Sequence, residues 1–126
     1  MAIVLRRGER TIAMTNTRFL PHHRLHVYGI ACEMLVAVRD AHLRDAKLRD
    51  EALRAAKGMC LNIAEGAGRA TRADKARAYT IARGEAVECA AALEISALLG
   101  DARSEDAARV GSLASSVISM LTRLIL

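Results

Sequence analysis

Apolar residues recur at three- and four-residue steps along most of this chain, which is the pattern of helices that bury one side. Four stretches show it, and we expect helices at about 22–42, 46–66, 72–99 and 104–125. The short connectors between them favour an antiparallel up-down-up-down four-helix bundle. No stretch has a strand pattern, so the predicted fold class is all-α, with residues 22–126 as the bundle.

Residues 1–21 precede the bundle as a basic N-terminal extension without clean periodicity. Four arginines and one glutamate give this extension a net charge of +3, out of +5 for the whole chain. Both Met1 and Met14 are possible natural start residues.

Two glycines, Gly66 and Gly68, follow the second apolar pattern, and we expect them to end that helix. Thr71 stands three residues before Asp74, a spacing similar to a capping box at a helix start. The second and third helices should therefore be joined by a short turn.

The third stretch is apolar on all sides. Tyr79 and Leu93 belong to its core stripe, whereas Val87 and Ile95 fall on other sides. This pattern indicates burial on more than one face, which points to self-association in so small a domain.

Two short signals flank the connection to the fourth helix. Gly100 should end the third helix and Ser104 should cap the fourth. The fourth stretch is broken by serines and Arg123, so we interpret it as amphipathic and not as a membrane span.

Composition adds a broad functional class. A length of 126 residues suits one domain, and the net charge of +5 favours RNA or DNA as a partner, although basic bundles without such partners are common. Cys32, Cys60 and Cys89 lie in separate helical patterns without a CxxC pair. Buried free thiols in a reducing compartment explain them best, and we expect a cytoplasmic protein.

The best candidate for binding nucleic acid is the start of the third helix. Its basic residues are Arg69, Arg72, Lys75 and Arg77. Cations beside helix N-terminal amides suit a phosphate group, and the small number of aromatic residues argues for salt-sensitive contacts to the backbone. The alternative is that these side chains are solvated, or pair with Glu65 and Asp74.

A second polar set lies within the bundle pattern. It comprises Asn62, Glu65, Arg83 and Glu88. We expect Glu65 to reach Arg83 and Asn62 to bond across the bundle, so that the set fixes helix register; a small functional site is the less favoured alternative.

Catalysis and metal binding find little support. His22 and His26 are one helical turn apart, beside His23, but no third ligand of fixed geometry is evident. No nucleophile has a plausible base, and residues 66–68 follow a helix, so they are no dinucleotide fingerprint. We expect no enzymatic activity, no cofactor and no metal.

Three stretches resemble the 23S rRNA intervening-sequence family, a four-helix-bundle family also called S23. They are LRAA at 53–56, LNIAEG at 61–66 with Gly68-Arg69, and IARG at 81–84 with Glu88 and Leu93-Glu94. Residues 27–35 are similar to its first helix, and the likeness covers about 24–125. Departures are Gly84-Glu85 in place of Gly-Ser, and Ala67 in place of an aromatic residue.

The resemblance implies a cytosolic bundle that assembles as a ring-like homopentamer without enzymatic activity. It implies relatives encoded within insertions of 23S rRNA genes, and distant ones that serve diversity-generating retroelements and bind nucleic acid and a reverse transcriptase. We therefore expect a homo-oligomeric bundle that binds RNA or DNA through basic surface. The alternative is a protein-interaction adaptor without nucleic-acid binding, whose partner covers the outer apolar faces.

Overall fold

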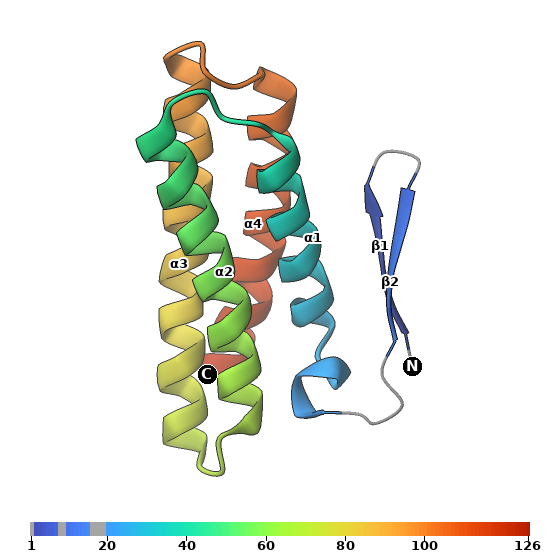
Figure 1. Cartoon of the computed structure of the whole chain (residues 1–126). Coiled ribbons are helices and arrows are strands. Elements are labelled where there is room, and N and C mark those ends of the chain that lie inside the picture. The colour runs from blue at the N-terminus through green and yellow to red at the C-terminus, as the bar shows by residue number, and fades with distance from the viewer. Residues whose placement is uncertain (1, 8–9, 16–19) are drawn as a thin grey trace.

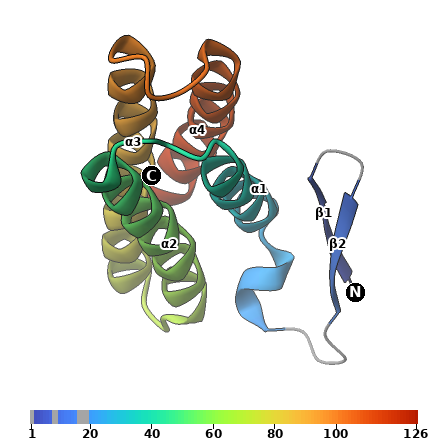
Figure 2. The same cartoon turned by 45° about the horizontal axis from the view of Figure 1, so that its top comes forward.

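Four helices account for most of the chain in the computed structural model, which describes residues 2–7, 10–15 and 20–126. They are α1 (His26–Asp40), α2 (Ala46–Gly68), α3 (Arg72–Leu98) and α4 (Ser104–Ile125). Each helix packs against the next, and α4 returns to α1 (Figure 1). Figure 2 shows α1 and α3 at opposite corners. The predicted all-α four-helix bundle is confirmed.

Small and aliphatic side chains fill the space between the helices. The largest fully buried ones include Met34, Met59, Ile63, Leu93 and Leu121. Buried alanines occur on both α2 and α3: Ala52, Ala55, Ala56, Ala82 and Ala86. Since alanine has only a methyl group, these two helices can approach closely. None of the described helices is long and apolar enough to cross a lipid bilayer.

Gly66 does not end α2, and this part of the prediction is wrong. The helix continues to Gly68, and Gly66 is buried against α3. A Cβ atom at position 66 would lie 2.6 Å from Cε1 of Tyr79. The residue is therefore a glycine because the Tyr79 ring occupies the space of a side chain.

The other helix ends agree more closely with the sequence patterns. Thr71 Oγ1 accepts a hydrogen bond from the Asp74 amide at 3.1 Å, as expected of a helix cap. Gly100 follows α3 with a φ of +77°, a left-handed conformation that favours glycine. Ser104 is not the cap of α4: Arg103 holds that position, without a side-chain cap hydrogen bond.

The expectation that the chain has no strands is wrong for the N-terminal extension, which contains two. Strands β1 (Ala2–Arg7) and β2 (Arg10–Thr15) form an antiparallel pair, with Ala2 opposite Thr15 and Arg7 opposite Arg10. Two short runs on either side of Gly8-Glu9 are a hairpin signal that the helical periodicity does not reveal. A 3-10 turn, η1 (Pro21–Arg24), then leads into α1, which begins later than predicted.

Candidate nucleic-acid interface and apolar surface

The turn between α2 and α3 carries the four basic candidates, and Lys75 has a structural task there. Its Nζ donates to the main-chain oxygens of Gly66, at 3.3 Å, and Ala67, at 2.9 Å. These carbonyls belong to the last turn of α2, where the regular helical hydrogen bonds end, and the Gly66 oxygen also accepts from the Arg69 amide at 3.3 Å. Lys75 therefore caps α2 from the neighbouring helix. Because its ammonium group already donates two hydrogen bonds within the protein, it is less available to bind a phosphate group.

The three arginines differ in their partners. Arg69 forms an ion pair with Glu65 one turn earlier, and this hydrogen bond raises the pKa of the guanidinium. Arg72 donates to the main-chain oxygen of Leu126. Arg77 is exposed and forms no hydrogen bond or ion pair with another residue in the described part of the chain. Arg72 and Arg77 are thus the candidates without an Asp or Glu side chain as partner, although Arg72 is bonded to Leu126.

A half-open pocket of about 240 Å³ lies beside this turn. Two arginines, Arg69 and Arg77, and two acidic residues, Glu65 and Asp74, are among its lining residues. The formal charges of these four groups cancel. The pocket is therefore a weaker site for a phosphate than the sequence pattern indicates.

The predicted polar network of Asn62, Glu65, Arg83 and Glu88 is not formed. Each of the four residues has a different partner. Asn62 donates to the Gly58 carbonyl at 2.8 Å, and Glu65 pairs with Arg69. Arg83 donates to Thr122 Oγ1 at 2.9 Å, and Glu88 pairs with Arg54 at 2.8 Å. Arg83 contacts α4, whereas Glu65 pairs along its own helix. The expected bond between them is therefore wrong, because Glu65 is paired with Arg69 and Arg83 is bonded to Thr122.

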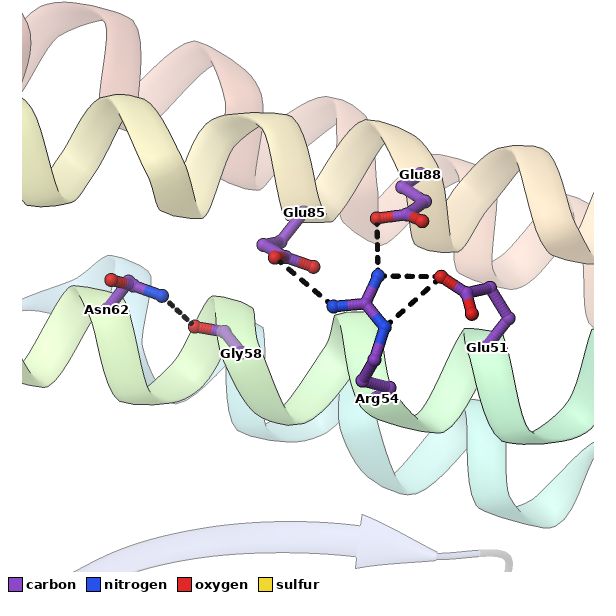
Figure 3. A network of polar contacts seen from close by, with 6 residues as sticks. All are labelled: Glu51, Arg54, Gly58, Asn62, Glu85 and Glu88. Atoms are coloured by element: carbon purple, nitrogen blue, oxygen red, sulfur yellow. Dashed lines mark hydrogen bonds and ion pairs between the residues drawn. The ribbon is translucent and has the colours of Figure 1, made fainter.

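The polar network that does join α2 and α3 is centred on Arg54 (Figure 3). Its Nη2 lies 2.7 Å from Glu51 Oε1 and 2.8 Å from Glu88 Oε2, and its Nη1 lies 3.5 Å from Glu85 Oε1. The hydrogen bonds to Glu51 and Glu88 raise the pKa of Arg54, and the bond to Arg54 lowers the pKa of Glu51. We call these four residues the Arg54 network.

Glu85 is the least exposed carboxylate of this network. Its Oε2 is buried and has no hydrogen-bond partner. A Cβ atom on Gly58 would lie 3.2 Å from the Glu85 Cδ, so the glycine provides room for this carboxylate. Of the network, the sequence analysis identified only Glu88. The three-residue spacing of Glu51 and Arg54 was the one available signal, and it does not reveal partners on another helix.

The histidines and cysteines lie apart from this network. His22 packs with its ring centroid 4.6 Å from Tyr28 and 4.3 Å from His23. No group of three or more His, Cys, Asp or Glu that could hold a metal ion occurs in residues 2–7, 10–15 and 20–126. Cys32, Cys60 and Cys89 are free and buried, as expected from the sequence.

The outward side of α3 carries several exposed apolar residues. We define the outer face of α3 as Gly84, Val87, Ala91, Ile95 and Leu98. Val87 is 48% exposed, Ile95 45% and Leu98 86%. The steps between these positions are three and four residues, which places them along one line of the helix. A continuous apolar line therefore faces away from the bundle.

Comparison with known proteins gives the chain its family. No curated protein sequence matches it. The model of the 23S rRNA-intervening sequence protein family matches residues 23–123, which include α1, α2, α3 and all but the last two residues of α4. The helical bundle and the motifs at 53–56, 61–66 and 81–84 lie within this range. The chain belongs to the 23S rRNA-intervening sequence protein family.

Proposed function

We propose that this protein is a non-enzymatic bundle that assembles with further copies of itself through the outer face of α3. The observation that carries the proposal is the exposure of Val87, Ile95 and Leu98 on one line of a helix whose other side is already buried in the core. Contiguous exposed apolar surface of this kind marks interaction sites in soluble proteins.

The spacing of the outer face suits another helix as the covering element. Its positions repeat over seven residues, from Gly84 to Ala91 and from Ala91 to Leu98, as in helices that pack side by side. Gly84 and Ala91 have small side chains, so a second backbone can come close between the larger residues. The copy number implied by the family resemblance is five.

Assembly also supports the second part of the proposal, which is binding of RNA or DNA. Each copy adds a net charge of +5 and two arginines, Arg72 and Arg77, that are not paired with an Asp or Glu side chain. Weak phosphate contacts from several linked copies reinforce one another, because the later contacts form at high effective concentration. The polyanion would contact these two arginines, of which Arg77 also lines the pocket beside the α2–α3 turn.

Light scattering on the purified chain tests the assembly. The wild type should have an oligomeric mass at micromolar concentration, and the double variant Ile95→Glu, Leu98→Glu should have the monomer mass. The matched control is Ser115→Glu, Ser119→Glu, which places the same charges at exposed positions of α4. A wild type that stays monomeric would contradict the assembly and favour the adaptor alternative, in which a different protein covers the outer face.

Fluorescence anisotropy with a labelled RNA hairpin tests the second part. Affinity should fall steeply with salt, and Arg72→Ala with Arg77→Ala should reduce the slope of log affinity against log salt by roughly 2. The control is Arg44→Ala with Lys47→Ala, two exposed cations at the other end of the bundle. An equal loss of affinity in both double variants would contradict the proposed site. An affinity that does not change with salt would contradict binding through phosphate contacts.

A further inference from the structure

The outward side of α2 carries an exposed leucine beside a groove. Leu61 is 69% exposed, although α2 buries its other side in the core. It borders a shallow, open groove of about 510 Å³, which we call the α2 groove. The groove is lined by two leucines, one glycine and three charged residues: Leu53, Leu61, Gly58, Asp50, Arg54 and Lys57. The protein therefore has a second surface with exposed apolar groups, on a different helix from the outer face of α3.

The outer face of α3 and the α2 groove differ in charge. Residues 84–98, which contain the outer face, include three glutamates and no lysine or arginine. Glu94 in this stretch is exposed and forms no hydrogen bond or ion pair with another residue in the described part of the chain. Residues 47–61, which contain the groove, include two lysines, two arginines and two carboxylates. Opposite charge therefore favours contact between these two surfaces, whereas two α3 faces would repel each other.

The two surfaces also complement each other in shape. Gly84 begins the outer face of α3, and nothing lies within 4 Å of a Cβ atom placed there. Such an open position can receive a projecting side chain from another helix, as a hole receives a knob. Leu61 is a projecting side chain of this kind on α2. An apolar knob on one surface thus has a matching hole on the other.

Contacts within one chain fix the heights of these two residues along the bundle. The Glu85 carboxylate lies against Gly58, where a Cβ atom would be 3.2 Å from the Glu85 Cδ (Figure 3). Leu61 is about one turn beyond Gly58 on α2, and Gly84 is next to Glu85 on α3, so the two residues have similar heights. Rotation of a second copy about an axis parallel to the helices keeps these heights. Leu61 of one copy can then lie opposite Gly84 of the next.

We propose that the α2 groove of one copy binds the outer face of α3 of the next copy. The proposal rests on the assembly proposed above and identifies the surface that covers the outer face. The contact joins two different faces, so each copy in a complex of two still has one unoccupied face for a further copy. Repetition of such a contact gives a ring when the rotation between copies closes.

Two variants that each damage one face test this contact by light scattering. Leu61→Glu places a carboxylate at the groove and should have the monomer mass at micromolar concentration, as should Ile95→Glu, Leu98→Glu. An equimolar mixture of these two variants should have the mass of a dimer, because one intact groove meets one intact α3 face. The matched control is Leu124→Glu, which makes the same change at a 41% exposed leucine of α4 and should keep the wild-type mass.

Gly84→Leu tests the shape of the contact without a change of charge. A Cβ atom at this position has open space in the single chain, but the new side chain would occupy the place of Leu61 in the complex. The variant should be monomeric, with the circular dichroism of a folded helical protein. Gly111→Leu on α4 is the control, since a Cβ atom there also has nothing within 4 Å, and it should assemble like the wild type.

The outcomes distinguish this contact from the assembly itself. A wild type that stays monomeric would overturn both proposals. Assembly of Leu61→Glu or Gly84→Leu to the wild-type mass, with Ile95→Glu, Leu98→Glu monomeric, would overturn the role of the α2 groove and leave assembly through α3 intact. A mixture of the two monomeric variants that forms no dimer would also overturn the groove, because no contact between unlike faces would then exist.

Discussion

Helices α3 and α4 pack against each other, yet their outward sides differ in polarity. On α4 the buried residues Val110, Val117 and Leu121 lie on one face, and serines at 112, 115, 116 and 119 are exposed. On α3 the buried face is just as regular, but Val87, Ile95 and Leu98 lie outside it. The comparison teaches that within a single chain the outward side of α4 is polar, whereas the outward side of α3 leaves large apolar side chains exposed to solvent.

The two helices also differ in how they are attached to a neighbour. Helix α3 meets α2 through the close contact of Gly66 with Tyr79, the Arg54 network and the Lys75 cap. Helix α4 meets α3 through the Arg83–Thr122 hydrogen bond and meets α1 through the Arg109–Glu33 ion pair. Since α3 is held firmly on its inner side, its outer face is a rigid surface suited to binding.

The largest expected effect separates the inner and outer sides of α3. Leu93→Ala should lower the free energy of unfolding by about 2–5 kcal/mol, because Leu93 is fully buried. Val87→Ala should change it by less than about 0.5 kcal/mol. Urea unfolding in the Ile95→Glu, Leu98→Glu background measures both without a contribution from assembly. Equal losses at the two positions would contradict the distinction between the sides.

The next effect concerns the contact between α2 and α3. Gly66→Ala should cost about 1–3 kcal/mol of unfolding free energy, because the new methyl group collides with the Tyr79 ring. Gly68→Ala is the matched control: nothing lies within 4 Å of a Cβ there, so helix propensity should make it neutral or slightly stabilising. Urea unfolding of both variants measures the two changes in stability. A Gly66→Ala variant as stable as the wild type would show that Gly66 and Tyr79 are not closely packed.

The Arg54 network should give α3 a response to acid. The hydrogen bond from Arg54 lowers the pKa of Glu51 below its ordinary value of 4.5. The stability gained from this pair is therefore present above pH 4.5 and is lost as the pH falls through the lowered pKa. Thermal unfolding should show that Arg54→Met reduces stability at neutral pH and flattens its fall in acid.

Lys57→Met is the control for this measurement, since Lys57 is exposed on α2 one turn after Arg54. It should leave the shape of the stability curve against pH unchanged. An Arg54→Met protein with the same acid response as the wild type would show that the four side chains do not act together.

The smallest effect is expected at the start of α3. Lys75→Met keeps most of the apolar stem but removes the donor to the last carbonyls of α2, and should cost about 0.3–1 kcal/mol. Lys47→Met, at an exposed position, should cost less. Urea unfolding with paired samples measures the difference, and an effect of Lys47→Met as large as that of Lys75→Met would mean that charge alone matters.

Periodicity was sufficient to predict the helices, because each element buries one regular stripe of its own residues. Gly100 and the Thr71 cap were also predictable, since both depend on residues within one short segment. Gly66 was not, because a glycine at a helix end and a glycine under a tyrosine ring look the same in sequence. What differs is Tyr79, which lies on another helix.

The predicted polar network was wrong for the same physical reason. Arg54 and Glu88 pair across helices, and their meeting depends on the rotation and axial offset of α2 against α3, which no local spacing specifies. Lys75 was correctly placed at a helix start, but its carbonyl partners belong to the preceding helix. In contrast, Val87 and Ile95 of the outer face were predicted from the sequence, because they lie on one element, whereas Leu98 was not named.

Hydroxyl-radical footprinting of α3 at several protein concentrations tests the central claim most directly, because it reports the exposure of single side chains in solution. Leu98, which is 86% exposed in the single chain, should be protected at micromolar concentration and become reactive on dilution. The reactivity of Leu124, an exposed residue of α4, should stay constant. A Leu98 side chain that reacts fully at every concentration would contradict the account.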